Sequence, residues 1–276
     1  MSTATPPAQP TVEPVLKIER QGAVEIATLN RPEHLNAISP DLATALRSYF
    51  IGLADRLDVR VVILRGAGRA FCAGAELGSD AFATEGPGRN QRQMAMQRLY
   101  SGMVRAMRAC PQPIIALVNG PACGAGFSVA LGADVRSAAD DARLNAAYLR
   151  VGLGGCDMGS GYLLPRLVGL SVASELLMTG NFIGAQRALA VGLVSSVTPI
   201  DGLLDAGLAL ASDMLRASPM GLRMTKESLN LLIDAGGLDA GLTLEDRQQV
   251  ILLATEDHHE AVRAFKAKEA PAYKDS

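Results

Sequence analysis

The stretch VNGPACGAGFSVALGAD, residues 118–134, begins as a glycine-rich loop and continues as an apolar helix. It continues a buried-strand pattern, PIIALVNG, over residues 113–120. Glycine and alanine let backbone N–H groups approach a ligand oxygen without obstruction by side chains. Because the loop opens a helix, its free N–H groups and the positive end of the helix dipole point the same way. The stretch therefore predicts a site for an anionic oxygen; the alternative is that small residues only allow a helix to pack closely on a strand.

A second unit of the same kind lies earlier in the chain. The buried-strand pattern VRVVILRG, residues 59–66, runs into the loop GAGRAFCAGAEL, residues 66–77. Two such loops together would aim two backbone N–H groups at one oxygen, which is the arrangement that stabilises an enolate. The pair therefore predicts an enolate-stabilising site, and the close-packing alternative stays open for either loop alone.

The composition narrows the class of protein. The chain has 276 residues, 49% of them hydrophobic, and 26 basic against 28 acidic side chains, so it can bury a large core and lacks the positive field typical of nucleic-acid binding. Its four cysteines form no CxxC pair, which is typical of a reducing compartment, and a cytoplasmic location is expected. No basic-then-apolar leader and no run of about 18 apolar residues occurs, so neither secretion nor a membrane span is predicted.

Alternating strand and helix patterns predict an α/β core. Residues 15–19 and 24–29 are predicted to form a hairpin, followed by a helix from the N-cap Ser39 to residue 57. Further patterns predict a strand over 59–66, a helix over 90–108, a strand over 113–120 and a hairpin or strand pair within 134–145. The remainder is mainly helical, with a short strand at 193–198 and helix starts at the capping residues Ser171, Asp201, Ser218 and Asp257. We therefore expect a disordered tail over 1–14, a core over 15–200 and a helical C-terminal region over 201–276.

Common cofactor and metal motifs are missing from the sequence. No glycine pattern completes GxGxxG, and no P-loop sequence occurs. The three histidines, His34, His258 and His259, form no HExxH motif, and adjacent residues on a helix do not face the same way. The sequence therefore predicts no metal site and gives little support to a Ser–His–acid triad.

Four motifs in a fixed order resemble the enoyl-CoA hydratase/isomerase, or crotonase, superfamily. They are LNRPEHLNAIS at 29–39, AFCAGAEL at 70–77, NGPACGAGFSVALGAD at 119–134 and GLVSSV at 192–197, and the resemblance extends over residues 15–275. It implies an α/β fold, a crotonase-like spiral of ββα units with a C-terminal helical trimerisation region. It also implies a homo-trimer or a dimer of trimers that binds acyl-CoA thioesters. No cofactor is then bound permanently, because coenzyme A enters as part of the substrate.

The same resemblance assigns binding roles to individual residues. It implies that the thioester oxygen is held by the backbone N–H groups of Ala75 and Ala125. The coenzyme A portion is expected near residues of the first two motifs, namely Asn36, Ala37, Cys72 and Ala73, and near an aromatic and basic pair at the C-terminus, Phe265 and Lys268, often across a subunit boundary. The alternative for that pair is a solvated amphipathic helix. One departure is the sequence after the first loop, Leu77-Gly78-Ser79, where relatives often have a lysine.

The acid or base is harder to assign, because the two glutamates of a typical hydratase are absent. Their positions match Ser128 and Tyr148, neither of which readily exchanges a proton at neutral pH. The stretch GGCDMGSG resembles the place where dienoyl-CoA isomerases carry a catalytic aspartate, here Asp157, although the local spacing is one residue longer. Asp157 is therefore expected to act as the base, to cap the helix leading to Leu164, or to do both.

The expected function is that of an acyl-CoA-processing enzyme that stabilises a thioester enolate. Hydration of a 2-enoyl-CoA follows from the overall resemblance. Isomerisation of an enoyl- or dienoyl-CoA by Asp157 is the chemical alternative, because it needs proton transfer but no paired glutamates. A non-catalytic acyl-CoA-binding protein is the alternative from another class: the missing glutamates favour it, and the two apparent amide donors oppose it.

Overall fold

A six-stranded sheet forms the centre of the computed structural model, which describes residues 13–78 and 85–276. The strand order is β1-β2-β3-β4-β6-β9. The first two strands form the predicted antiparallel hairpin, and every other neighbouring pair is parallel. The strands are β1 (Leu16–Gln21), β2 (Val24–Leu29), β3 (Val61–Gly66), β4 (Ile114–Val118), β6 (Val135–Ala139) and β9 (Ser196–Thr198).

A smaller sheet corrects one prediction. It consists of β5 (Ala122–Cys123), β7 (Arg143–Asn145) and β8 (Ile183–Gly184), in that order. The segment 134–145 does contain two strands, β6 and β7, but they lie in different sheets and form no hairpin. The reason is that β4 and β9 already occupy both edges of β6, so β7 pairs with β5 and β8 instead.

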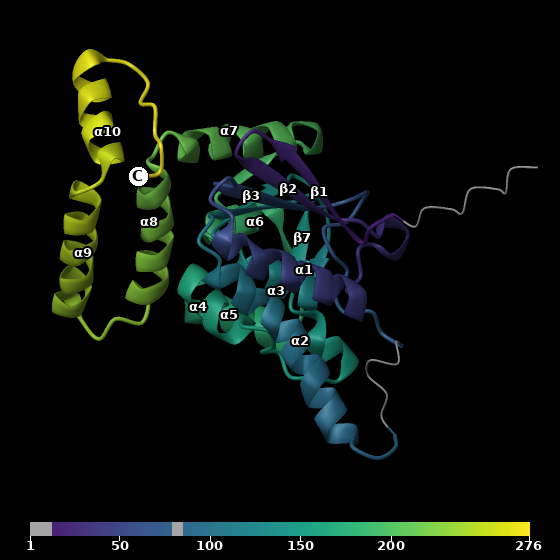
Figure 1. Cartoon of the computed structure of the whole chain (residues 1–276). Helices are drawn as coiled ribbons and strands as arrows, with labels where there is room; N and C mark the ends of the chain where they lie inside the picture. The colour runs from purple at the N-terminus through teal and green to yellow at the C-terminus, as the bar shows by residue number, and fades with distance from the viewer. Residues whose placement is uncertain (1–12, 79–84) are drawn as a thin grey trace, which may run out of the picture.

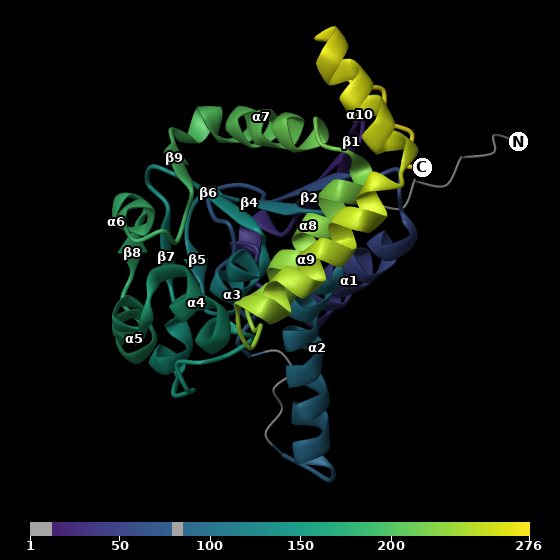
Figure 2. The ribbon, with the colours of Figure 1, turned by 90° about the vertical axis from the view of Figure 1, so that its left-hand side faces the viewer.

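Helices cover both faces of the large sheet (Figure 1). The helix α7 crosses one face, and α1, α2 and α3 lie on the other side, as the turned view in Figure 2 also shows. Close contact under α7 depends on Gly207, where an added Cβ would lie 2.8 Å from Leu117 Cδ1. The helices are α1 (Pro40–Gly52), α2 (Arg89–Ala109), α3 (Ala125–Gly132), α4 (Ser160–Val168), α5 (Leu170–Thr179), α6 (Ala185–Ala190), α7 (Leu203–Leu215), α8 (Pro219–Leu232), α9 (Leu238–Leu253) and α10 (Glu256–Ala267).

The predicted helix caps are partly confirmed. Ser39 and Ser218 are N-caps, and each side chain accepts a hydrogen bond from the backbone N–H three residues on. Both precede a proline at the first helical position, so two start signals coincide there. The predictions at Ser171, Asp201 and Asp257 are wrong, because Gly169, Gly202 and Thr255 hold those N-cap positions. Asp257 is not an N-cap because its carboxylate accepts hydrogen bonds from the backbone N–H groups of Lys274 and Asp275 instead.

The last three helices stand to one side of the core, and α9 and α10 lie beyond α8 (Figure 1). Lys226 of α8 fixes this arrangement, with a side chain only 4% exposed. Its Nζ pairs with Asp134 Oδ2 at 2.9 Å and donates to the carbonyls of Met107 and Gln112 at 3.0 and 2.8 Å. Breaking such a buried, fully hydrogen-bonded charge pair is costly, so α8 is held in one register on the core.

Two further expectations concern the chain ends and membranes. The predicted tail, residues 1–14, lies outside the described residues except for Glu13 and Pro14, which both accept hydrogen bonds from the Asn30 side chain. Within residues 13–78 and 85–276, no helix combines the length and the apolar character needed to cross a bilayer.

Candidate active site

The two predicted loops pair with each other. Cys72 N donates to Pro121 O at 3.1 Å, and Cys123 N donates to Cys72 O at 2.9 Å. The first loop therefore runs beside the second as a short parallel strand would. Close approach requires Gly126, since a Cβ there would lie 2.4 Å from Cys72 O.

The N–H group of Ala75 points away from Ile38, its partner in a parallel bridge. On the side of the chain that faces Ile38, Ile38 N donates to Gly74 O at 2.7 Å, and Ile38 O accepts from Glu76 N at 3.0 Å. In a parallel bridge of this kind, the residue between the two bonded neighbours directs its own N–H to the opposite side. Among the described residues, no acceptor satisfies the Ala75 N–H.

The N–H group of Ala125 also has no acceptor within the described part of the chain, for a different reason. Ala125 is the first residue of α3, so no preceding turn supplies a carbonyl for its N–H. The N-cap Gly124 has φ 49° and ψ −118°, a conformation that only glycine adopts easily. A Cβ on Gly74 would lie 2.9 Å from Cys123 O and 3.7 Å from Ala125 N, so the absence of a side chain at Gly74 lets the loops meet.

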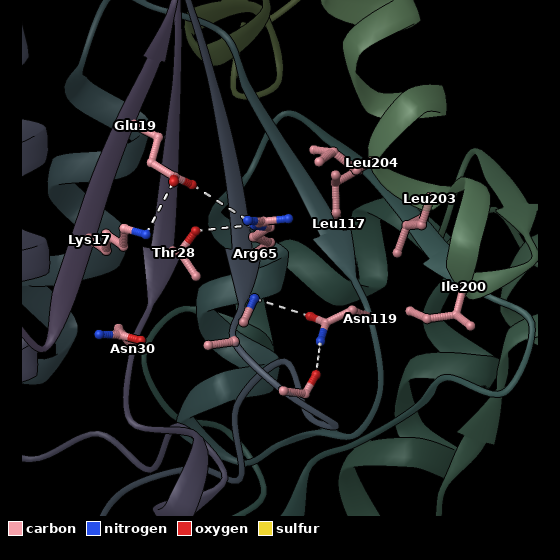
Figure 3. Close-up of a pocket in the computed structure, with 13 residues that line it drawn as sticks. Lys17, Glu19, Thr28, Asn30, Arg65, Leu117, Asn119, Ile200, Leu203 and Leu204 are labelled. Carbon is pink, nitrogen blue, oxygen red and sulfur yellow. Dashed lines mark hydrogen bonds and ion pairs between the residues drawn. The ribbon is translucent and has the colours of Figure 1, made fainter.

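One side chain ties the bases of the two loops together. Asn119 directly follows β4 and begins the second loop. Its Oδ1 accepts from Gly66 N and its Nδ2 donates to Gly68 O, both at 3.0 Å, at the start of the first loop (Figure 3). The position of one loop is therefore set relative to the other.

Ser128 and Tyr148 form a buried, neutral pair. Their side chains are almost inaccessible, at 0% and 5% exposed, and their hydroxyl groups are hydrogen-bonded to each other. Burial raises the pKa of Tyr148 above its ordinary value, so the phenol stays protonated at neutral pH. The Tyr148 hydroxyl also donates to Gly124 O at 2.8 Å, and this carbonyl belongs to the same peptide group as the Ala125 N–H. The pair therefore contacts the candidate donor peptide but offers no ready proton acceptor.

Asp157 lies beside this pair with one carboxylate oxygen unengaged. Its Oδ1 accepts from Met158 N at 2.7 Å and from the side-chain amide of Gln97 on α2. Its backbone carbonyl lies 3.0 Å from Ser128 Oγ, whose single proton is shared between this carbonyl and the Tyr148 hydroxyl. No donor to Oδ2 occurs in the described part of the chain. The helix α4 begins at Ser160 with Gly159 as its N-cap and no side-chain cap, so the alternative that Asp157 caps this helix is wrong.

The residues expected to contact coenzyme A differ in accessibility. Asn36 is 0% exposed, and its side chain is used internally: Oδ1 accepts from Arg31 N at 2.9 Å, and Nδ2 donates to the carbonyls of Ala67 and Ala70 at 2.8 Å. The Asn36 side chain therefore holds the first loop and has no donor left for a nucleotide. Cys72 is also fully buried.

The other two residues of this group reach the surface. Ala73 is exposed and Ala37 is half-buried. An ion pair that sequence reasoning missed stiffens this region: Arg31 Nη2 lies 2.7 Å from Glu76 Oε1, and Arg31 Nη1 donates to Ala37 O at 2.6 Å. Because Glu76 directly follows Ala75, the pair anchors the first loop.

Phe265 and Lys268 are not brought to the loops within one chain. Phe265 is 85% exposed on α10, and Lys268 follows that helix in a left-handed conformation with φ 58°. Both views show α10 beyond α8 and away from α3 (Figures 1 and 2). A contact between this pair and coenzyme A therefore stays a prediction.

Sequence reasoning also missed Gln97 and the linking role of Asn119. Gln97 lies in a polar helix and carries no motif, and its partner Asp157 is 60 residues away. Asn119 is part of a quoted motif, but its contacts with Gly66 and Gly68 span the two loops and leave no local pattern. No group of metal-ligating side chains occurs within the described residues.

Comparison with known proteins identifies the family of the chain. The family model described as enoyl-CoA hydratase/isomerase matches residues 19–276. A Mycobacterium tuberculosis protein called "Probable enoyl-CoA hydratase EchA12" is 37% identical over 268 residues, covering 96% of this chain and 94% of that protein. The 1,2-epoxyphenylacetyl-CoA isomerase of Escherichia coli is 34% identical, covering 89% and 93%. The crystal structure of enoyl-CoA hydratase from Bacillus anthracis superposes with a TM-score of 0.89 at 31% identity, covering 95% of this chain and 100% of that one.

The chain therefore belongs to the enoyl-CoA hydratase/isomerase family and has the crotonase fold. It is an acyl-CoA-processing enzyme of the hydratase/isomerase kind. The expectations for fold class and for an enzyme are confirmed.

Proposed function

We propose that the N–H groups of Ala75 and Ala125 form an oxyanion hole for the thioester carbonyl of an acyl-CoA. Loss of a proton next to the thioester places negative charge on the carbonyl oxygen, giving an enolate. Fixed amide donors stabilise that charge without reorganising during the reaction. The observation that supports this proposal is that both N–H groups, where the two loops meet, lack an acceptor among residues 13–78 and 85–276.

Asp157 is the group that removes and returns the proton. The two donors that the described residues supply to its carboxylate bind Oδ1, which leaves Oδ2 to accept a proton from the substrate. Gln97 acts as a positioning residue, because its amide fixes the orientation of the carboxylate. A single base of this kind supports double-bond isomerisation: the α-proton moves to Oδ2, a dienolate forms, and the proton returns at the γ-carbon.

Hydration of a 2-enoyl-CoA is the second candidate, and the names of several relatives favour it. It requires a group that positions water and a group that delivers a proton. Ser128 and Tyr148 occupy the places of the glutamates as a neutral, buried pair, which opposes this reaction. The deciding experiment is to incubate 2-hexenoyl-CoA and 3-hexenoyl-CoA separately with the enzyme in D₂O.

We expect faster deuterium incorporation and double-bond migration than addition of water, with the products followed by mass spectrometry and NMR. Hydration that outpaces exchange would instead favour the hydratase reaction. Neither exchange nor turnover with several acyl-CoAs would favour a non-catalytic binding protein.

A Tyr148→Phe substitution tests the role of the buried pair. We expect the free energy of unfolding to fall by about 1 kcal/mol, because hydrogen bonds are lost. Proton exchange should fall by less than about tenfold, since a neutral phenol is not the base. Because burial raises its pKa, Tyr148 stabilises the fold fully below about pH 10, where the unfolded chain keeps it neutral, and less above that pH. Urea titrations should show that the free energies of unfolding of the wild type and Tyr148→Phe differ less at pH 11 than at pH 8. A hundredfold loss of proton exchange in Tyr148→Phe would instead indicate that Tyr148 is catalytic.

We further propose that residues 201–276 include a trimerisation region and that Phe265 and Lys268 reach the coenzyme A of a neighbouring subunit. Large apolar side chains are exposed along α8, α9 and α10, which is typical of a surface covered by other subunits. They are Leu229, Leu231, Leu238, Leu242, Val250, Ile251, Leu253 and Phe265.

Sedimentation at micromolar concentration should therefore give three or six times the chain mass of 28.9 kDa. Val250→Asp, at a site 66% exposed on α9, should shift the protein towards monomers, because it would bury an unpaired charge. Ile51→Asp, at a site 52% exposed on α1, is the matched control and should leave the mass unchanged. A wild-type monomer would contradict the proposal.

A further inference from the structure

A cavity of about 410 Å³ lies at the face of the large sheet that α7 crosses (Figure 3). It opens between the strands β1, β2 and β3 on one side and the start of α7 on the other. None of Ala75, Ala125 and Asp157 lines it, so it is distinct from the candidate donors and base, although its lining includes Gly66, Gly68 and Asn119 at the bases of the two loops. Its volume is in the range of small-molecule sites.

Strand register gathers charged side chains in this cavity. Lys17 pairs with Thr28, and Thr28 pairs with Arg65, so the three project from one face of neighbouring strands. Glu19 is two residues from Lys17 on β1 and shares that face. Arg65 is the central charge, with a side chain 31% exposed.

The Arg65 guanidinium is only partly satisfied. Its Nε donates to Thr28 Oγ1 at 3.1 Å, and its Nη2 lies 3.6 Å from Glu19 Oε2, which is too long for a hydrogen bond. Glu19 is closer to Lys17, at 3.1 Å. In the described part of the chain, no other acceptor bonds the Arg65 side chain. Its terminal N–H groups are therefore available for a planar anion, which a guanidinium binds through two parallel hydrogen bonds.

The opposite wall of the cavity is apolar. Ile200, Leu203 and Leu204 approach from the segment that begins α7, and Leu117 projects beside Arg65 from β4 (Figure 3). The cavity thus presents a cationic side and an aliphatic side to one ligand.

We propose that this cavity binds an aliphatic carboxylate, with its carboxylate on Arg65 and Lys17 and its chain against Leu117, Leu203 and Leu204. The charges match a monoanion: Lys17 and Arg65 contribute two positive charges and Glu19 one negative charge, leaving one positive charge. A dianion would bring a second negative charge that this net charge does not balance, and its repulsion from Glu19 would be greater than that of a monoanion. This site is additional to the acyl-CoA site and does not depend on the proposed reaction.

The test is binding of hexanoate, measured by ligand-observed NMR on the full chain, with hexanamide as its neutral counterpart. We expect hexanamide to bind at least about tenfold more weakly, because it cannot form the charge-assisted pair. Arg65→Met should weaken hexanoate by a similar factor. Arg216→Met, the same change at a 78% exposed site beyond the far end of α7, is the control and should have no effect.

Two further measurements keep the proposal falsifiable if Arg65→Met folds poorly. Glu19→Gln removes the competing carboxylate from an exposed strand and should tighten hexanoate binding about threefold or more. Saturating butyryl-CoA should leave hexanoate binding unchanged, since the two sites are separate. Equal binding of hexanoate and hexanamide, weaker or unchanged binding in Glu19→Gln, or displacement of hexanoate by butyryl-CoA would each overturn the proposal.

Discussion

Replacing Ala125 with proline is expected to lower kcat/KM for an acyl-CoA substrate by about 10² to 10³, the usual effect of losing one oxyanion donor. Proline has no N–H, and its ring would occupy the place from which the donor reaches the thioester oxygen. The fold should tolerate the change, because Ala125 is the first residue of α3, where proline fits helical geometry and no intrahelical hydrogen bond is lost. Steady-state kinetics with the double-bond isomerisation assay gives the measurement.

Ala125→Gly is the matched control for this substitution. It also changes the side chain, but it keeps the N–H group, so activity should stay within about tenfold of the wild type. Circular dichroism and thermal melting should show both variants folded. A folded Ala125→Pro enzyme with wild-type turnover would exclude this N–H group as a donor.

Asp157→Asn is expected to reduce exchange of the acyl-CoA α- or γ-proton with D₂O by at least about a hundredfold. The asparagine Oδ1 can still accept from Met158 N and Gln97, so the loop should keep its conformation. Its amide nitrogen would then replace the free Oδ2, which removes the proton acceptor. Stability should change little, because neither bond to Oδ1 needs to be lost.

Asp141→Asn, at an exposed turn position, is the control for the loss of one negative charge and should exchange at the wild-type rate. If Asp157→Asn retains full exchange, Asp157 has only a structural role. Isotope incorporation measured by mass spectrometry separates these outcomes without requiring net turnover.

Local signals in the sequence predicted the elements that hold the candidate donors. Strand-to-loop transitions that end in runs of small residues predicted the two loops, and the resemblance to the crotonase superfamily then implied Ala75 and Ala125 as the donors within them. Both strands predicted within 134–145 are present, but a hairpin between them is wrong, because the partners of a strand depend on which sheet edges are free.

The contacts of Asn36 show a second limit of prediction from sequence, which is that side-chain partners can lie far away along the chain. An asparagine beside an expected nucleotide resembles a binding residue in sequence, yet its side chain is satisfied by Arg31, Ala67 and Ala70. Whether the Asn36 side chain binds a ligand or backbone carbonyls depends on its contacts with the loop at 67–70, which lies more than 30 residues further along the chain. Gln97 and Asp157 likewise meet only after α2 and α4 are placed.

The hydrogen bonds of the Asn119 side chain couple the movements of the two loops. One amide side chain holds the bases of both loops, so a displacement of either base is transmitted to the other. Thermal fluctuations of the two donors should therefore be correlated, and the spacing between the donors should vary less than their positions relative to the sheet. The distance between the two N–H groups of the proposed oxyanion hole is therefore maintained even while the surrounding sheet and helices move.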